Sequence, residues 1–147
     1  MNNKQEKARL VLELFKQARD NEITTQVRSH YIFYLFQEEV NIEVFNYTTT
    51  EENGTYSPEL HATFQFLCSK NYLTRKKSTK PITYALTDTG REEYRRLQDE
   101  LLPLDEEHRQ QLEYFASMWV DISIQRLIEH TEYHHPEYVR PKGFDWF

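Results

Sequence analysis

The sequence contains very little cysteine and glycine, and both shortages restrict its structure. Cys68 is the single cysteine among 147 residues, so an internal disulfide framework is excluded. Only 3 glycines and 5 prolines are present, which argues against long disordered linkers. Because Cys68 lies on an apolar helical pattern, we expect its thiol to be buried and reduced.

Long apolar runs and a surplus of basic residues are also missing. No run reaches the ~18 apolar residues of a membrane span, and the polar start MNNKQEKARL lacks the apolar centre of a signal peptide. These features predict a cytoplasmic protein. The net charge is −6, whereas a dedicated DNA-binding domain usually carries excess lysine and arginine that neutralise phosphates. A local basic patch is compatible with this net charge.

The length and the aromatic content indicate a folded domain. A chain of 147 residues can bury a core without disulfides. The 10 tyrosines and 9 phenylalanines predict that this core is rich in aromatic side chains. We therefore expect residues 1–147 to form a single domain.

Hydrophobic periodicity predicts two helices at the start of the chain. Residues 4–19 carry an amphipathic stripe, which consists of Leu10, Val11, Leu14, Phe15 and Ala18. Residues 20–24 then form a link, and Thr24 or Thr25 caps the helix QVRSHYIFYLFQEEV. This second helix is apolar around much of its circumference, which is typical of a central core helix or of an interface.

A helix start is well specified in the middle of the chain. The β-branched and aromatic residues of 42–50 predict a short strand, and EENG predicts a turn. Ser57 suits the N-cap, Pro58 the first helical position and Glu59 the first turn, where unpaired N–H groups favour negative charge. The buried stripe of this helix is Leu60, Thr63, Phe64, Leu67 and Cys68.

A β-hairpin and further helices are predicted in the second half. Residues 70–90 alternate apolar and polar side chains around a basic turn, whose cations are Arg75, Lys76, Lys77 and Lys80. Thr87 or Asp88 caps the next helix, which Pro103 ends. Two more helices follow at the apolar positions Leu112, Phe115, Ala116 and Trp119, and then Ile124, Leu127 and Ile128.

This order predicts the fold class. A helix followed by a two-stranded hairpin is the ending of a winged-helix unit. We expect an α+β fold, mostly helical, with a winged-helix-like core over residues 4–102. Residues 103–147 form a C-terminal helical extension that ends in an aromatic tail.

The sequence does not predict catalysis. His61 and Cys68 are seven residues apart, about 10 Å along a helix, which is too far for a nucleophile and its base. The chain has no glycine-rich phosphate loop. His130 and His134 share a helix face, but the order H-x-E-x-H differs from the zinc-protease order H-E-x-x-H and offers no third ligand. We therefore predict no catalytic residue, no cofactor, no metal ligand and no small-molecule substrate.

The basic hairpin and the aromatic tail are the clearest candidates for binding. The hairpin tip can be simply solvated, contact an acidic protein partner or follow a phosphate backbone. The preceding helix has no arginine and one late lysine, so it offers little for reading bases. The tail residues Phe144, Trp146 and Phe147 either pack back on the domain or anchor a partner.

Several short motifs carry a family resemblance. SHYIFYLFQEEVNIE, FNY, GTYSPELHATFQFLCSKNYL, YALTDTG and HTEYHHPEY follow one another in this order. Over residues 8–138 they resemble the YwgA-like bacterial proteins and, more distantly, the Panacea/SocA-type antitoxin domains. The resemblance implies a winged-helix-like α+β domain without an active site. It also implies that the protein functions through contacts with other proteins, as antitoxin-like or phage-defence regulatory components do.

The motif positions and the composition together predict a function. The resemblance implies structural roles for Phe45, Tyr47, Gly54, Tyr56, Ser57, Pro58 and Leu60. A partner surface around Tyr47 and Tyr56 is the alternative role. We predict a non-enzymatic protein-interaction and regulatory module that binds a protein partner or forms a homodimer. The alternative is a winged-helix DNA-binding transcription regulator that uses the basic hairpin, with nucleic acid as the secondary partner.

Overall fold

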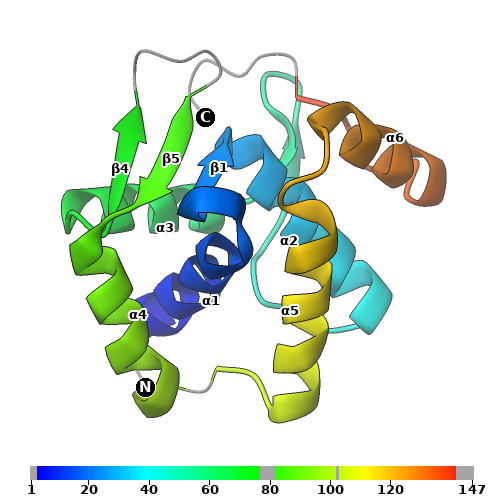
Figure 1. Ribbon diagram of the computed structural model, residues 1–147. Helices are drawn as coiled ribbons and strands as arrows, with labels where there is room; N and C mark the ends of the chain where they lie inside the picture. The colour runs from blue at the N-terminus through cyan, green and yellow to red at the C-terminus, as the bar shows by residue number, and fades with distance from the viewer. Residues whose placement is uncertain (1–2, 77–81, 102, 142–147) are drawn as a thin grey trace.

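The computed structural model describes residues 3–76, 82–101 and 103–141 of the chain (Figure 1). Within these ranges the fold is α+β and mostly helical, as the sequence predicts. In chain order the elements are α1 (Asn3–Gln17), the 3-10 helix η1 (Arg19–Asn21), β1 (Glu22–Thr24), α2 (Gln26–Val40), β2 (Thr48–Thr50), β3 (Gly54–Tyr56), α3 (Pro58–Ser69), β4 (Leu73–Lys76), β5 (Thr83–Leu86), α4 (Asp88–Glu100), α5 (Glu106–Trp119) and α6 (Ile124–His134).

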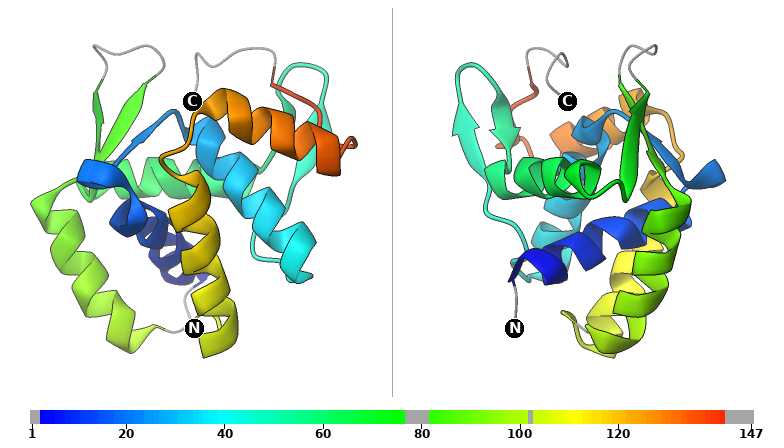
Figure 2. Two further views of the ribbon diagram at one scale, coloured as in Figure 1. Left: turned by 45° about the vertical axis from the view of Figure 1, so that its right-hand side comes forward. Right: turned by 90° about the vertical axis from the view of Figure 1, so that its left-hand side faces the viewer.

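Besides the helices, the described residues form two small antiparallel sheets. Helix α1 lies near the centre and packs against α3, α4 and α5 (Figure 1). Strands β1, β5 and β4 form one sheet in that order, with Tyr84 of β5 opposite both Ile23 and Arg75. Strands β2 and β3 form a separate hairpin, which the right-hand view of Figure 2 shows apart from the first sheet. Among the described residues, no helix combines the length and apolarity needed to cross a bilayer.

Helix α2 is the most buried element. Every residue from Gln26 to Phe36 is buried, because α3, α5 and α6 all pack against this helix. Its apolar circumference therefore reflects a central place in the core, one of the two readings that its sequence pattern allows. Burial of this many aromatic and aliphatic side chains is the main favourable contribution to folding.

Side-chain caps start the helices where the sequence predicts them. Thr25 Oγ1 accepts a hydrogen bond from the Val27 N–H at 3.2 Å, and Ser57 Oγ accepts one from the Leu60 N–H at 3.1 Å. Thr87 Oγ1 accepts a bond from the Gly90 N–H at 2.9 Å. Each cap satisfies an N–H group that has no partner within its own helix.

Two predicted elements are present with shorter bounds, and two local expectations are wrong. Helix α1 ends at Gln17 rather than at residue 19, and the link over 20–24 contains strand β1, which pairs with β5. The strand expected over 42–50 is reduced to Thr48–Thr50. Gln37 Oε1 accepts the backbone N–H groups at positions 44 and 45, so this loop needs no partner strand. Cys68 is half-buried rather than fully buried.

A C-terminal segment returns to the β2–β3 hairpin. The Val139 N–H donates to Thr55 Oγ1 at 2.8 Å, and the Thr55 N–H donates to the Val139 carbonyl at 2.9 Å. Gly54 has a positive φ of 69°, and a Cβ there would lie 2.6 Å from the Val139 oxygen. Glycine is therefore required both for the backbone conformation and for the close approach of this segment. Nearby, Tyr138 is buried with its ring 4.5 Å from the ring of Tyr31.

Candidate functional site

The described part of the basic hairpin divides its cations between two faces. Because side chains alternate along a strand, Arg75 and Lys76 lie on opposite faces of β4. The Arg75 guanidinium lies 6.0 Å from the ring centre of Tyr84, on the side of α3. Lys76 forms an ion pair with Glu22 of β1 on the other face. Lys77 and Lys80 lie outside the described residues, so half of the predicted patch has no structural description here.

The outward face of α3 is uncharged over most of its length. Its exposed positions include Ala62, Gln65 and Ser69, and the first cation is Lys70 at the C-cap. Near the N-terminus of the helix, Glu59 forms an ion pair with Lys7 at 3.0 Å. The described part of this face therefore lacks the arginines that read bases in a DNA groove. It also lacks a row of lysines that could contact phosphates.

A polar network lies beneath α3 in the core. The amide oxygen of Gln26 is 3.2 Å from His30 Nε2 and 3.0 Å from His61 Nδ1. The Gln26 amide nitrogen donates to the Tyr84 hydroxyl at 3.1 Å. Gln26 is only 1% exposed, so these partners satisfy an amide that would otherwise be costly to bury.

The backbone determines the tautomer of His30. Because the Ser57 N–H donates to His30 Nδ1 at 3.1 Å, this ring nitrogen accepts and Nε2 carries the proton given to Gln26. Burial, with a smaller contribution from the nearby His61, lowers the pKa of His30 to about 3. Burial also lowers the pKa of His61, with a smaller contribution from the Arg75 charge. Both rings are therefore neutral at physiological pH.

This network forms one wall of a surface pocket of about 410 Å³ between α3 and the β4–β5 hairpin. We call it the α3–hairpin pocket. It combines buried aromatic rings with amide, imidazole, thiol and guanidinium groups. Its lining residues are Gln26, His61, Phe64, Gln65, Cys68, Arg75 and Tyr84.

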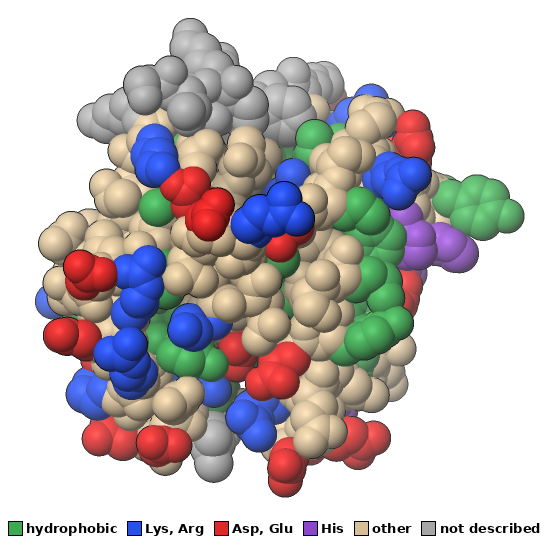
Figure 3. Space-filling view, in the orientation of Figure 1, with side chains coloured by type: hydrophobic (Ala, Val, Ile, Leu, Met, Phe, Trp, Pro, Cys, Tyr) green, Lys and Arg blue, Asp and Glu red, His purple; other side chains and the backbone are tan. Residues whose placement is uncertain are grey.

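A second candidate surface covers α5 and α6. Tyr133 is 82% exposed, Tyr114 61% and Met118 40%, although large apolar side chains usually avoid water. Figure 3 shows hydrophobic side chains gathered over α5 and next to histidines at α6, whereas acidic and basic side chains alternate over α4. We call Tyr114, Met118, Trp119, His130, Tyr133 and His134 the α5–α6 aromatic surface.

Contacts between tilted aromatic rings join the two helices of this surface. The ring of Trp119 lies 4.5 Å from that of His130, which lies 4.4 Å from that of His134. The Tyr133 ring follows at 5.0 Å from His134. Burial, and then the proximity of His134, lowers the pKa of His130, so this ring is neutral at pH 7. Tyr133 and His134 are exposed, so these two rings form the outward part of the row.

An arginine from the core holds the corner between α5 and α6. Arg28 of α2 donates through Nη1 to the carbonyls of Trp119, at 3.3 Å, and Ile122. The Asp121 carboxylate in the same corner accepts the Arg19 N–H at 3.0 Å. These bonds satisfy carbonyls at the end of α5 and fix the direction in which α6 leaves.

Two tyrosines near the β2–β3 hairpin, which were expected to contact a partner, are partly turned toward the interior of the protein. Tyr47 and Tyr56 are both half-buried. The Tyr47 hydroxyl donates to the His30 carbonyl at 2.5 Å, and both tyrosine rings lie 6.4 Å from the His30 ring. These contacts favour the structural role over a partner surface. Phe144, Trp146 and Phe147 lie outside the described residues.

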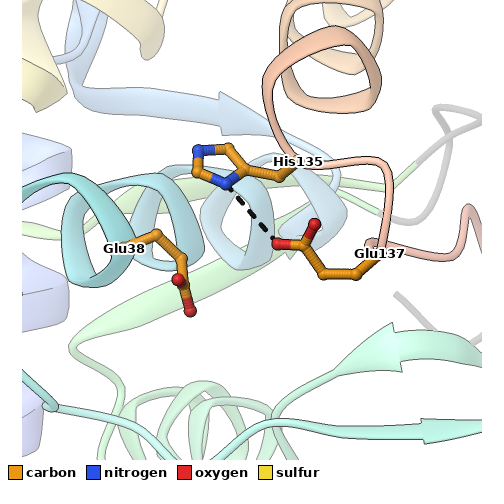
Figure 4. Close-up of side chains that lie close together, drawn as sticks. All are labelled: Glu38, His135 and Glu137. Atoms are coloured by element: carbon orange, nitrogen blue, oxygen red, sulfur yellow. Dashed lines mark ion pairs between the residues drawn. The ribbon is translucent and has the colours of Figure 1, made fainter.

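Three side chains of the kinds that can bind a metal ion lie close together beside Tyr34. Glu38 from α2 approaches His135 and Glu137, and one ligand atom of each lies within 4.8 Å of the others (Figure 4). His135 Nδ1 is 3.5 Å from Glu137 Oε1, which also accepts the Tyr34 hydroxyl at 2.6 Å. Both carboxylates are exposed, and such groups often meet without an ion. The group therefore does not by itself define a metal centre.

Sequence reasoning missed the α5–α6 aromatic surface and the α3–hairpin pocket. Tyr114 and Met118 are four residues apart and lie off the core stripe of α5, so a second apolar stripe was the available signal for the surface. The pocket joins Gln26, His61 and Tyr84 from three elements distant in sequence, and no local pattern links them.

Comparison with known proteins found no match among protein-family models, curated proteins or solved structures.

Proposed function

We propose that this chain is a non-enzymatic protein-interaction and regulatory module that self-associates through the α5–α6 aromatic surface. The observation that carries the proposal is the exposure of Tyr114, Met118 and Tyr133 on adjoining helices. Exposed aromatic residues and methionine are enriched where proteins bind one another. An antitoxin-like or phage-defence regulatory role is the biological setting that the YwgA-like motifs support.

Two further features favour protein contacts over nucleic acid. The chain is acidic overall, and the outward face of α3 carries little positive charge. Tyr114 and Tyr133 are exposed aromatic side chains, which bury large areas at little entropic cost when they enter an interface.

The oligomeric state tests this proposal directly. We expect light scattering to give twice the monomer mass for the wild type and the monomer mass for Tyr114→Ser/Tyr133→Ser, because the double change removes two exposed aromatic anchors. The control variant Glu92→Ser/Arg95→Ser changes two exposed residues of α4 and should remain dimeric. Circular dichroism should be equal for all three proteins.

Two results would contradict self-association through this surface. One is a wild-type protein that stays monomeric at high concentration. The other is a double variant that keeps both its fold and its dimer mass.

The order of elements supports a second candidate function, a winged-helix transcription regulator. Helices α1, α2 and α3 precede the β4–β5 hairpin, and β1 joins its sheet beside β5, as in a winged helix. In this reading the hairpin follows the phosphate backbone.

Binding to genomic DNA fragments at low salt separates the two functions. If the protein is a transcription regulator, its DNA affinity should fall steeply as the salt concentration rises. Binding should also be lost when the hairpin cations Arg75, Lys76, Lys77 and Lys80 are all changed to Ala. Arg95→Ala/Arg126→Ala on α4 and α6 provides a control for loss of positive charge elsewhere. Binding that is absent, or equal in the hairpin variant and the control, excludes this reading.

A further inference from the structure

The α3–hairpin pocket has the shape and size of a ligand site. Its volume of about 410 Å³ is within the range of roughly 300–1,000 Å³ that is common for small-molecule pockets. Its walls come from three elements, because Gln26 begins α2, His61, Gln65 and Cys68 lie on α3, and Arg75 and Tyr84 lie on the hairpin. These groups converge on one hollow from different directions.

The interior groups of the pocket are fixed before any ligand arrives. Tyr84 is 2% exposed and Phe64 1%, and their rings lie 5.1 Å apart in an edge-to-face contact. The Gln26 amide donates to the Tyr84 hydroxyl oxygen at 3.1 Å and thereby fixes the position of this ring. A site with preset donors loses little freedom on binding, and this favours affinity.

The charge of the pocket is positive. Arg75 is the cation among the described lining residues, and none of these residues is a carboxylate. The field of Arg75 reaches three other lining groups, because it acts to lower the pKa of His61, Cys68 and Tyr84. Burial nevertheless raises the pKa of Cys68 and Tyr84 overall, so both stay protonated and neutral at physiological pH.

A second pocket of similar volume has the opposite charge. It has about 400 Å³ next to the loop after α2, and its lining includes Glu38 and Glu43 without a described cation. An anion would be repelled there, whereas Arg75 attracts one at the α3–hairpin pocket. The chemistry of the lining, rather than the volume alone, therefore selects the ligand.

We propose that the α3–hairpin pocket binds a small organic carboxylate with a compact aromatic or apolar body. The carboxylate lies against the Arg75 guanidinium, whose fork of N–H donors suits two oxygens. The body of the ligand occupies the hollow between α3 and β5, next to the Tyr84 and Phe64 rings. This site differs from the α5–α6 aromatic surface and does not depend on the function proposed for that surface.

Three small probes test the two parts of this ligand. Chemical-shift mapping of ¹⁵N-labelled full-length protein should give saturable shifts with benzoate at residues 61–68 and around Arg75. Benzamide has the same ring without the charge, and acetate has the charge without the ring. Each should bind at least about tenfold more weakly than benzoate, since each lacks one of the two interactions.

Matched variants assign the binding to Arg75. Arg75→Gln should weaken benzoate roughly tenfold or more, which is the size expected for a lost charge-assisted bond. Lys76→Gln removes the neighbouring cation on the opposite face of β4 and should leave benzoate binding unchanged. Both positions are exposed, so both variants should fold.

Several results would overturn the proposal. Benzoate shifts that do not saturate, or that map elsewhere, show that the pocket takes no such ligand. Equal affinity for benzamide removes the role of the charge, and equal affinity for acetate removes the role of the body. Equal losses in the Arg75 and Lys76 variants reduce the effect to general electrostatic attraction.

Discussion

At the scale of the residue, His30 shows how polar groups are accommodated in the core. Its ring accepts from the Ser57 N–H and contacts the Gln26 amide, while its carbonyl accepts the Tyr47 hydroxyl. His30 thereby ties α2 to the start of α3 through its ring, and to the loop before β2 through its backbone carbonyl. Such a network is stable only while the ring stays neutral, because a second ring proton would face the Ser57 N–H.

Stability should therefore depend on pH through His30. The unfolded ring titrates near 6.5, and burial lowers its pKa in the folded chain to about 3. Between these values the unfolded state binds one more proton, so the free energy of unfolding falls as the pH falls. We expect this group to remove about 2 kcal/mol between about pH 7 and pH 5, measured by urea unfolding.

Two variants isolate this contribution. His30→Gln should lower stability at neutral pH but flatten the pH dependence by the same amount of about 2 kcal/mol. Gln125→Ser changes an exposed, non-titratable residue of α6 and should keep the wild-type slope. A His30→Gln protein with the wild-type slope would assign the acid sensitivity to other groups.

At the scale of the element, Gly90 determines how α4 meets the hairpin. The glycine lies in the first turn of α4, and a Cβ there would lie 2.1 Å from the Tyr72 carbonyl oxygen. The same oxygen accepts the Thr87 N–H at 3.1 Å. The absence of a side chain at position 90 therefore lets the helix start lie directly on the strand entry.

Gly90→Ala provides a test in which local and tertiary effects have opposite signs. Helix propensity alone predicts a gain of up to about 1 kcal/mol, because alanine is the better helix former. The collision with the Tyr72 backbone predicts instead a loss of roughly 2–4 kcal/mol in the free energy of unfolding. Thermal unfolding decides the sign, with Thr89→Ala at the adjacent exposed position as control. A more stable Gly90→Ala protein would mean that α4 is not docked in this way.

The elements also show what the sequence could and could not predict. Caps such as Ser57 and Thr87 act within one turn, and the apolar stripes repeat within one helix, so local patterns locate the helices well. Strand β1 has only three residues and depends on β5, about 60 residues later in the chain, so no local periodicity identifies it. The α3–hairpin pocket is missed for the same reason, since its chemistry exists only after α2, α3 and β5 come together.

At the scale of the whole molecule, the C-terminal helices belong to the core rather than merely following it. Helix α5 packs on both α1 and α2, and α6 packs on α2. Leu112 and Ala116 of α5 and Leu127 of α6 are at most 1% exposed. The faces that they cover on α1 and α2 are themselves apolar and would meet water without them.

Removal of this part should therefore unfold the rest. We expect a fragment of residues 1–102 to lack cooperative unfolding and a dispersed ¹H–¹⁵N spectrum, although it contains the whole of the core that the sequence predicts over residues 4–102. Each large apolar side chain contributes roughly 1.5–3 kcal/mol when buried, and several such losses exceed a typical stability of about 5–15 kcal/mol. Residues 1–141 provide the control, because this fragment keeps α5, α6 and Tyr138 and should unfold as cooperatively as the full chain. If residues 1–102 gave a dispersed spectrum and a sharp transition, the chain would consist of an independent core and a separate helical extension.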